Sequence, residues 1–299
     1  MPRAIIIKPL QFRSGTGVMG LNDQLNAVGD LRGKSALITG AGRGIGQRLA
    51  VQLARCGAAV VVNDLDSDPT HETVSEIESA GGQAVACAGS VTADDFPQRF
   101  IDTALDTFGR IDIIVNNAGY IWNDPIDRIE DDQWDAIQDV HLKAPFRILR
   151  AAAPHIKQAS KEEASRGERV VRKIVNVSSV SATQGAFGQA NYAAAKAGLI
   201  GLTRTLSKEW GRFNVTVNCV AFGYVETRLT ATSEDDQSIQ IGDREHRVGL
   251  RPDQSKMTEM MIPLGRKATP EEAANGALLL CLPESDYISG QVIEVAGGL

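Results

Sequence analysis

KSALITGAGRGIGQRLAVQLARCG, residues 34–57, contains a predicted strand, a glycine-rich turn and a predicted helix in immediate succession. Its first six residues, KSALIT, form the apolar run that is typical of a buried strand. The segment from Gly44 to Cys56 has a helical composition, and Gly57 directly after it is the kind of residue that ends a helix. The stretch therefore predicts the first strand-to-helix unit of an α/β fold.

The same order of strand, turn and helix recurs along the chain. AAVVVND is the second predicted strand, and a predicted helix from Pro69 to Ala80 follows it and ends at Gly81 and Gly82. Further apolar runs with the character of strands are QAVACAG, IDIIVNN, RKIVNVS, NVTVNCVA and QVIEVAG. This alternation predicts a parallel sheet with helices on both faces, whose ligands bind at the carboxyl ends of the strands where the strand order reverses.

Composition limits the classes of function. The 299 residues have room for one large α/β domain or two small ones. The net charge is −6 and no basic run appears, so we expect no nucleic-acid partner. No stretch is long and apolar enough for a membrane span or a signal peptide, which makes the cytoplasm the expected location. The cysteines are widely spaced and predict neither a metal site nor a disulfide framework: Cys56, Cys87, Cys219 and Cys281.

The glycine-rich turn has the character of a dinucleotide site. Its glycines let the backbone approach a pyrophosphate, whose charge the amide groups at the start of the helix near Gly44 stabilise. Asp64 ends the second strand, 18 residues past Gly46, near the spacing at which an acidic residue binds the adenosine ribose. A carboxylate there repels a 2′-phosphate and favours NAD over NADP. Arg43 in the turn favours NADP instead, and Asp66 is an alternative ribose partner.

A second stretch, GQANYAAAKAGLIGLTRTLSKEW from Gly188 to Trp210, predicts a buried helix. Tyr192 and Lys196 are four residues apart and therefore project from one face, with roughly 6 Å between their Cβ atoms. A phenol has a pKa of about 10, and a fixed cation beside it favours the phenolate. Lys196 is therefore expected to lower the pKa of Tyr192 toward neutrality, where the phenol can act as an acid or a base. The alternative is that Tyr192 only packs and Lys196 lies along the helix.

These motifs occur in one order: TGxxxGxG (Thr39, Gly40, Gly44, Gly46), NNAG (Asn116 to Gly119), Ser179 thirteen residues before Tyr192, and YxxxK. The ordered set resembles the short-chain dehydrogenase/reductase superfamily over roughly residues 33–299. Within it, GQANYAAAKAGLIGLTRTL and SGQVIEVAGG are most similar to 3-oxoacyl thioester reductases and to the hydroxyacyl-CoA dehydrogenase type. The resemblance implies a single-domain Rossmann-type fold, a doubly wound parallel sheet with helices on both faces.

The resemblance also implies a division of the chain. Residues 33–299 would form the dinucleotide-binding catalytic domain, and residues 1–32 would be an N-terminal extension. Two segments are longer than the family pattern requires. Residues 157–171 are charged and predict a helix extension followed by a surface loop. Residues 228–262 are polar and without periodicity, and in the family this region covers the substrate.

Catalytic roles follow from the same resemblance. Tyr192 would be the acid or base, Ser179 would bond the same substrate oxygen, and Lys196 would lower the pKa of the phenol and bind the nicotinamide ribose. The family's usual asparagine, in a V-N-L-x-G pattern, is His141 here, in VHLKA. The imidazole is either a member of the proton relay or a support for helix packing. Ser178 should point the opposite way from Ser179 and serve structure.

The expected cofactor contacts are Gly40, Arg43, Gly44, Ile45, Gly46, Asp64, Ser90, Val91, Asn117, Ala118, Gly119, Tyr192, Lys196, Val225 and Thr227. Asn117 should anchor the end of its strand beneath the cofactor. Two departures from the family occur. Ser90-Val91 replaces an Asp-Val pair that touches the adenine, and Phe222-Gly223 replaces a Pro-Gly pair.

The first hypothesis is an oxidoreductase that transfers a hydride between NAD(H) and a secondary alcohol or ketone, with NADP less favoured as the cofactor. The favoured substrate is a 3-hydroxyacyl or 3-oxoacyl thioester. Alternatives are an NADPH-dependent 3-oxoacyl reductase of fatty-acid synthesis and a dehydrogenase of steroids or other bulky alcohols. A non-catalytic dinucleotide-binding protein would not need Ser179, Tyr192 and Lys196 together. The expected partners are a small-molecule substrate and further copies of the chain, as a tetramer or dimer, with no membrane and no metal.

Overall fold

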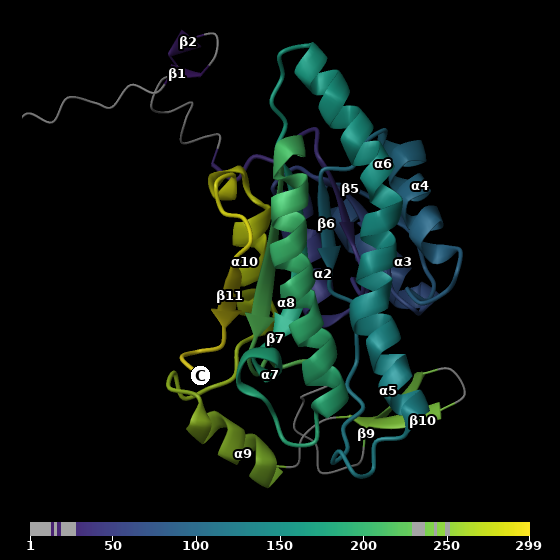
Figure 1. The fold of residues 1–299 in the computed structure, drawn as a ribbon, viewed down its shortest axis with the longest axis vertical. Helices are drawn as coiled ribbons and strands as arrows, with labels where there is room; N and C mark the ends of the chain where they lie inside the picture. The colour runs from purple at the N-terminus through teal and green to yellow at the C-terminus, as the bar shows by residue number, and fades with distance from the viewer. Residues whose placement is uncertain (1–12, 15–16, 19–27, 229–236, 242–243, 249–251) are drawn as a thin grey trace, which may run out of the picture.

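The computed structural model describes residues 13–14, 17–18, 28–228, 237–241, 244–248 and 252–299. Its centre is a seven-stranded sheet in the order β11-β8-β7-β6-β3-β4-β5, in which all neighbouring strands run parallel (Figure 1). The strands are β3 (Ser35–Ile38), β4 (Ala59–Val62), β5 (Gln83–Ala86), β6 (Ile113–Asn116), β7 (Arg172–Ser179), β8 (Val215–Phe222) and β11 (Val292–Val295). The predicted doubly wound α/β fold is confirmed, and each strand lies inside or beside the apolar run that predicted it.

Helices cover both faces of this sheet. The α-helices of the described residues are α2 (Gly44–Arg55), α3 (Ser67–Ser79), α4 (Phe96–Phe108), α5 (Asp131–Gln138), α6 (Ala144–Ser165), α7 (Val180–Gln184), α8 (Ala190–Trp210), α9 (Pro252–Met261) and α10 (Pro270–Cys281), of which α9 lies beyond the end of the sheet (Figure 1). Short 3-10 helices follow α8 and α10, at Gly211–Phe213 and Pro283–Ser285, and the π-helix η1 (Asp139–Lys143) joins α5 to α6. Apolar residues of α2, α3 and α10 share one core cluster, and those of α4, α6 and α8 share the other.

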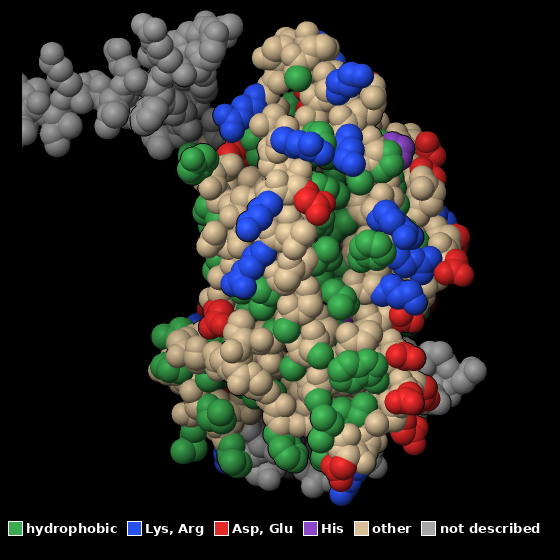
Figure 2. Space-filling model, in the orientation of Figure 1, with side chains coloured by type: hydrophobic (Ala, Val, Ile, Leu, Met, Phe, Trp, Pro, Cys, Tyr) green, Lys and Arg blue, Asp and Glu red, His purple; other side chains and the backbone are tan. Residues whose placement is uncertain are grey.

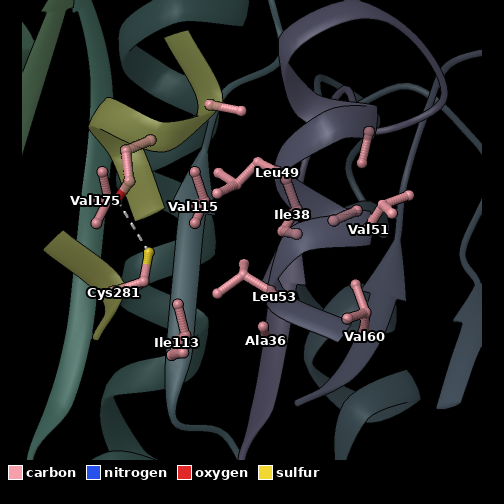
Figure 3. Packing of buried hydrophobic residues seen from close by; sticks show 14 of the residues in the cluster. Ala36, Ile38, Leu49, Val51, Leu53, Val60, Ile113, Val115, Val175 and Cys281 are labelled. Atoms are coloured by element: carbon pink, nitrogen blue, oxygen red, sulfur yellow. Dashed lines mark hydrogen bonds between the residues drawn. The ribbon is translucent and has the colours of Figure 1, made fainter. Parts of the chain in front are cut away.

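The strands alternate between these two cores. Ala36 and Ile38 of β3 face the α2 side, and Leu37 between them faces the α4 and α6 side. Figure 3 shows Leu49 and Leu53 of α2 packed over the strands on the first side. Because helices bury both faces of the central strands, most positions of β3, β4 and β6 are apolar, which made these strands recognisable. β7 and β8 also carry buried polar side chains with hydrogen-bond partners, such as Arg172, Asn176 and Asn218.

The strand order reverses between β3 and β6, which are neighbours in the sheet although two strands separate them in the sequence. A crevice for a ligand opens at such a point, beyond the carboxyl ends of the strands. The glycine-rich turn follows β3 there, and the NNAG segment begins with the last residue of β6. The fold thus brings together two motifs that are about eighty residues apart.

The N-terminal extension (residues 1–32) and the loop 228–262 are described only in part. The first includes a two-stranded hairpin of β1 (Arg13–Ser14) and β2 (Gly17–Val18), and the second a hairpin of β9 (Gln237–Ile241) and β10 (Arg244–Val248), followed by α9. Much of the expected extension and of the expected loop 228–262 lies outside the described residues. Leu31 is buried in the core and its amide donates to the Cys56 carbonyl, so the packed domain includes residues just before Gly33.

Two further expectations concern the surface. Residues 157–171 are as predicted, because α6 continues to Ser165 and a loop leads from it to β7. Within the described ranges, no helix has the length and hydropathy to cross a membrane.

Candidate active site

The Tyr192–Lys196 pair lies in the first turns of α8. The Lys196 ammonium is 5.6 Å from the centre of the Tyr192 ring. Lys196 is buried, and its ammonium donates a hydrogen bond of 2.7 Å to the carbonyl oxygen of Val177 on β7. The Ser178 hydroxyl donates to the Lys196 carbonyl over 2.9 Å, which is the structural role expected for Ser178. These bonds fix α8 against the end of β7 and hold the ammonium at a defined position.

Burial moves the pKa values of both groups away from those of free side chains. It raises the pKa of Tyr192 to about 12, against a smaller lowering by hydrogen bonding with Ser179. It also lowers the pKa of Lys196 to about 8. The structure corrects the expectation that Lys196 brings the phenol toward neutrality. A low-dielectric site disfavours the phenolate, and the ammonium is bonded to the Val177 carbonyl and does not offset that cost.

Ser179 is the last residue of β7 and caps the amino end of α7. Its hydroxyl oxygen accepts a hydrogen bond of 3.1 Å from the Ser181 amide. The side chain is 9% exposed, and it is close enough to Tyr192 for the hydrogen bonding that lowers the pKa of the phenol. The structure therefore brings Ser179, Tyr192 and Lys196 together at the carboxyl end of the sheet, from one strand and one helix.

His141 lies on the π-helix η1, an irregularity that is frequent at functional sites. Its Nε2 is 2.7 Å from the Tyr120 carbonyl oxygen, and since a carbonyl only accepts, Nε2 carries the proton. The edge of the ring meets Tyr192, with 5.0 Å between ring centres and 86° between planes. Burial and the charge of Lys196 hold the pKa of His141 well below 6.5, so the imidazole is neutral at pH 7.

The imidazole is packed tightly, and its second nitrogen is unused. Nδ1 is buried and has no hydrogen-bond partner among the described residues. A Cβ atom added to Gly119 would lie 2.0 Å from Cε1 of His141, so position 119 has no room for any side chain. Gly119 was expected to contact the cofactor, and the structure shows that it also makes space for His141.

Asn117 of the NNAG motif holds the glycine-rich turn in place. The Asn117 amide group donates to the carbonyl oxygens of Thr39, at 3.0 Å, and Gly40, at 2.9 Å. The Thr39 hydroxyl accepts from the backbone amides of Asn117 and Ala118, at 3.0 Å each. A Cβ atom on Gly46 would lie 2.1 Å from the Gly40 carbonyl oxygen, so α2 approaches the turn as only glycine permits. Asn117 thus anchors the strand ends, as predicted.

The start of α2 fits an anionic ligand. Arg43 is the N-cap residue and makes no side-chain cap, and the first turn has no acidic residue. The N-cap side chain does not bond the amide groups of this first turn, which carry the positive end of the helix dipole. Ile45 packs its side chain on the core, and a Cβ atom on Gly44 would lie 3.6 Å from the Thr227 methyl group. These features suit the pyrophosphate of a dinucleotide between the turn and residues 225–227.

Acidic and basic groups stand at the end of β4. The Gly42 amide donates to Asp64 over 3.0 Å, and Arg43 forms an ion pair of 2.8 Å with Asp66. Arg43 is 46% exposed and Asp66 is 55% exposed. The positive charge that would favour a 2′-phosphate is therefore already offset by Asp66, and Asp64 adds a second negative charge beside it.

The end of β5 carries the replacement for the family's Asp-Val pair. The Ser90 hydroxyl bonds the Thr92 hydroxyl over 2.8 Å, and Val91 is buried in the core. Sequence reasoning missed Asn63, whose side chain donates to the carbonyls of Cys87 and Gly89, over 2.9 and 3.0 Å. A polar residue just after the apolar strand AAVVV was the available signal. The remaining expected contact, Val225, pairs with Ala268 through an isolated bridge.

Sequence reasoning also missed two polar side chains that are hydrogen-bonded in a chain with Ser179, those of Ser181 and Gln189. The Ser181 hydroxyl donates to Oε1 of Gln189 over 2.7 Å, and the Ser179 hydroxyl donates to Ser181 over 3.2 Å. Nearby, the buried Asn191 accepts from the Tyr192 amide at 2.8 Å and donates to the Trp122 carbonyl at 3.1 Å. These bonds join the loop after β6 to the start of α8. The signals were the third serine in SSVS and the polar residues of GQAN.

The surface at this end of the molecule is divided by charge. Figure 2 shows acidic side chains over the lower right, where α5 lies, and apolar side chains over the lower left, where α9 lies. The exposed residues of α9 include Met257 at 66%, Met260 at 86% and Met261 at 63%. Methionine is flexible and polarizable and suits apolar ligands of irregular shape.

Comparisons with known proteins agree with this geometry. The sequence profile described as short chain dehydrogenase matches residues 34–238. The chain is 36% identical over 271 residues to the 3-oxoacyl-[acyl-carrier-protein] reductase FabG of Thermotoga maritima, covering 90% of this chain and 98% of that one. It is 37% identical to the short-chain reductase protein NovJ of Streptomyces niveus, over 88% of this chain and 92% of that one.

A solved structure is similar as well. It is a gluconate 5-dehydrogenase from Burkholderia cenocepacia in complex with NADP and tartrate, with a TM-score of 0.77 and 31% sequence identity. The similarity covers 91% of this chain and 97% of the other.

Proposed function

The chain belongs to the short-chain dehydrogenase family and is an NAD(P)-dependent oxidoreductase, and we propose that it transfers a hydride between NAD(H) and a 3-hydroxyacyl or 3-oxoacyl thioester. The observation that carries the proposal is the grouping of Ser179, Tyr192 and Lys196 at the carboxyl end of the sheet, beside the glycine-rich turn. The 36% identity to a 3-oxoacyl-[acyl-carrier-protein] reductase supports the substrate class. The exposed methionines of α9 at the same end of the molecule also support an apolar acyl chain.

The residues divide the work of ketone reduction. A nicotinamide cofactor bound at this site would supply the hydride. Tyr192, whose pKa burial raises to about 12, stays protonated at neutral pH and gives its proton to the oxygen of the forming alkoxide. Ser179 donates a hydrogen bond to the same oxygen and stabilises its negative charge. The Lys196 ammonium adds positive charge one turn away. A raised pKa makes the phenol a weaker acid, but it also keeps Tyr192 protonated at pH 7, which is the form that ketone reduction requires.

Preference for NAD over NADP is supported by the groups after β4. Asp64 and Asp66 carry two negative charges there, and Arg43 offsets one of them through its ion pair. A 2′-phosphate would meet a net negative charge, at a cost on the order of 1 to 3 kcal/mol in a partly screened site. The similar gluconate 5-dehydrogenase binds NADP, so this preference is a property we propose for this chain and not one taken from that relative.

A second candidate substrate is a small polyhydroxylated acid. Two observations favour it: the similarity to a gluconate 5-dehydrogenase, and the polar chain from Ser179 through Ser181 to Gln189. Against it stand the acidic side chains over α5, which would repel a carboxylate substrate at the same end of the molecule.

Location and assembly complete the proposal. A cytoplasmic enzyme is supported by the free cysteines among the described residues. An assembly of two or four copies is supported by exposed apolar side chains away from the site, including Phe146 at 45%, Leu279 at 65% and Ile293 at 37%. Sedimentation analysis over a range of protein concentrations tests the assembly.

One experiment tests the substrate and the cofactor together. Acetoacetyl-CoA, a longer 3-oxoacyl-CoA and a keto-gluconate are each offered with NADH and with NADPH, and cofactor oxidation is followed by absorbance. The proposal expects the highest kcat/KM with a 3-oxoacyl thioester and NADH. Faster turnover of the keto acid would favour the second candidate, and equal or faster turnover with NADPH would contradict the cofactor preference.

A further inference from the structure

A chain of hydrogen bonds runs from the proposed catalytic serine to an amide that can be turned around. Ser179 donates to Ser181 over 3.2 Å, and Ser181 donates to Oε1 of Gln189 over 2.7 Å. The backbone amide of Ser181 also donates to the Ser179 oxygen, at 3.1 Å. Ser179 and Ser181 are each 9% exposed, so bulk water has little access to either hydroxyl.

The direction of these bonds decides where the Ser179 proton points. An amide oxygen only accepts, so the Ser181 proton is committed to Gln189. The Ser181 oxygen can then only accept a hydrogen bond, and it accepts one from the Ser179 hydroxyl. In this arrangement Ser179 directs its proton away from the substrate side and cannot donate to a ketone oxygen.

Turning the Gln189 side-chain amide over reverses the chain. The amide nitrogen then donates a hydrogen bond to the Ser181 oxygen, and the Ser181 hydroxyl in turn donates a hydrogen bond to the Ser179 oxygen. Ser179 accepts from the amide and the hydroxyl of Ser181 together, which uses both of its lone pairs. Its proton becomes free to point at the reacting oxygen, and a hydroxyl that accepts two hydrogen bonds is a stronger donor.

We propose that Gln189, acting through Ser181, is a positioning residue that sets the donor direction of the Ser179 hydroxyl. This inference rests on the proposed function, because it assigns the freed proton to the oxygen of the substrate. Gln189 is suited to the role because its backbone is fixed. Its carbonyl accepts from Ala193 in α8 at 2.7 Å, and its bridge to Asp124 ties it to the loop after β6.

The test replaces the reversible amide with a group whose donor capacity depends on pH. Gln189→Glu has nearly the same shape, but its carboxylate only accepts, so Ser179 is held in the unproductive direction. We expect kcat to fall roughly 10- to 100-fold at pH 8, the equivalent of one or two hydrogen bonds, with the Kd of NADH unchanged. As the pH falls through the pKa of the new carboxyl, its proton can donate to Ser181, and kcat should recover.

Wild type should lack this recovery on the acid side. The ionisable groups that face the segment are Tyr192, Lys196, His141, Asp124 and Glu294, which accepts from Thr183 of α7. They are common to both proteins, so the difference between the two pH profiles belongs to residue 189. Gln184→Glu is the matched control, because it places the same new carboxyl at an exposed position of α7.

Coupling to Ser181 separates a hydrogen-bond effect from a packing effect. Ser181→Ala keeps the backbone amide and removes the hydroxyl that links Gln189 to Ser179. In that background, Gln189→Glu should have no further effect on kcat, whereas a general disturbance by the carboxylate would persist. Gln189→Met, which neither donates nor accepts strongly, should lose less activity than Gln189→Glu and show no recovery at low pH.

The outcomes distinguish the two proposals. Absence of turnover by wild type on every secondary alcohol and ketone tried would overturn the proposed function. An active wild type whose Gln189→Glu variant has an unchanged kcat, or a loss that is independent of pH or of Ser181, would overturn the role of Gln189 alone. Circular dichroism and NADH fluorescence on each variant establish that the fold and the cofactor site are intact.

Discussion

Tyr192 and Lys196 show how burial prepares two side chains in opposite ways. The phenol becomes harder to ionise, with a pKa near 12, and the ammonium becomes easier to neutralise, with a pKa near 8. Both shifts favour the uncharged form of the group, as expected where water is excluded. At neutral pH the pair therefore consists of a neutral acid beside a cation that is close to losing its proton.

Removing the phenolic oxygen should stop proton transfer with little other change. Tyr192→Phe keeps the ring and its edge contact with His141. We expect kcat to fall by roughly 10² to 10⁴ with the Kd of NADH near that of wild type. Steady-state kinetics and fluorescence titration measure the two quantities, and wild-type turnover by this variant would exclude Tyr192 as the proton donor.

Binding of the reduced cofactor should weaken above pH 8. The pKa of Lys196 is lowered to about 8, so its ammonium is present below that pH and is lost as the pH rises through it. If this ammonium holds the nicotinamide ribose, the Kd of NADH should rise roughly 3- to 30-fold between pH 7 and pH 9.5. Lys196→Arg stays charged throughout and should give a flat profile. A flat profile for wild type as well would mean that the ammonium does not take part.

Gly119 and His141 should behave as a coupled pair. Gly119→Ala would place a methyl group 2.0 Å from the imidazole, and relieving that overlap should cost about 1 to 3 kcal/mol of stability. Adding His141→Asn, a smaller side chain, should recover much of the loss. Gly201→Ala is the control, because Gly201 is at an exposed position of α8 and nothing lies within 4 Å of its new Cβ atom. Thermal unfolding of these variants and of His141→Asn alone measures the effect, and additive losses at 119 and 141 would contradict the coupling.

At the junction of α6 and β7, a buried ion pair joins two neighbouring elements. Arg172 is 3% exposed and makes two hydrogen bonds to Glu163, of 2.9 and 2.6 Å, and one of 3.0 Å to the Ile111 carbonyl. Glu163→Ala would leave the guanidinium buried without its partner, which we expect to cost about 3 to 5 kcal/mol. Glu168→Ala, in the exposed pair with Arg166, should leave the melting temperature almost unchanged.

Chemical denaturation of the Glu163→Ala and Glu168→Ala proteins separates the two cases. The pair lies at the end of the sheet opposite the catalytic residues, so the folded fraction of Glu163→Ala should keep its kcat. A stability loss below about 1 kcal/mol would show that the buried guanidinium finds another partner.

Strands that are buried on both faces could be predicted from their continuous apolar runs. The strands β3, β4 and β6 are apolar at nearly every position because helices cover each side, and the glycine turn marks the start of α2. The hairpin of β9 and β10 was missed, since QSIQI and REHRV alternate weakly and carry many polar residues. The helix α3 begins two residues before the predicted Pro69, at Ser67.

The site was predictable where a motif carries its own spacing. Tyr192 and Lys196 are related by one helical turn, so sequence alone places them on one face. Ser181 and Gln189 were missed, because their bond depends on how the chain folds back between α7 and α8. The neutral state of His141 and the raised pKa of Tyr192 also follow from burial, which no local pattern reveals.

The whole domain should respond to the cofactor as a unit. The proposed cofactor site takes residues from the ends of β3, β4, β5 and β6 and from the start of α2, so unfolding any of these loses the site. NADH at 100 times its Kd should stabilise the folded state by about 2.7 kcal/mol. At equal concentrations NADH should raise the melting temperature more than NADPH, and Asp64→Ala should narrow the difference. Equal shifts in the wild-type protein would contradict the proposed preference.

The π-helix at Asp139–Lys143 makes chain length itself a constraint. Its i to i+5 geometry uses one residue more than an α-helix would. Deleting that residue would rotate either α5 or α6 by about 100° about its axis. Ile137 of α5 and Ile148 of α6, both fully buried, could then no longer both face the interior. An insertion or deletion here would turn the apolar face of a whole helix away from the core, whereas a substitution changes only the contacts of one side chain. The number of residues between α5 and α6 is therefore constrained by the packing of both helices.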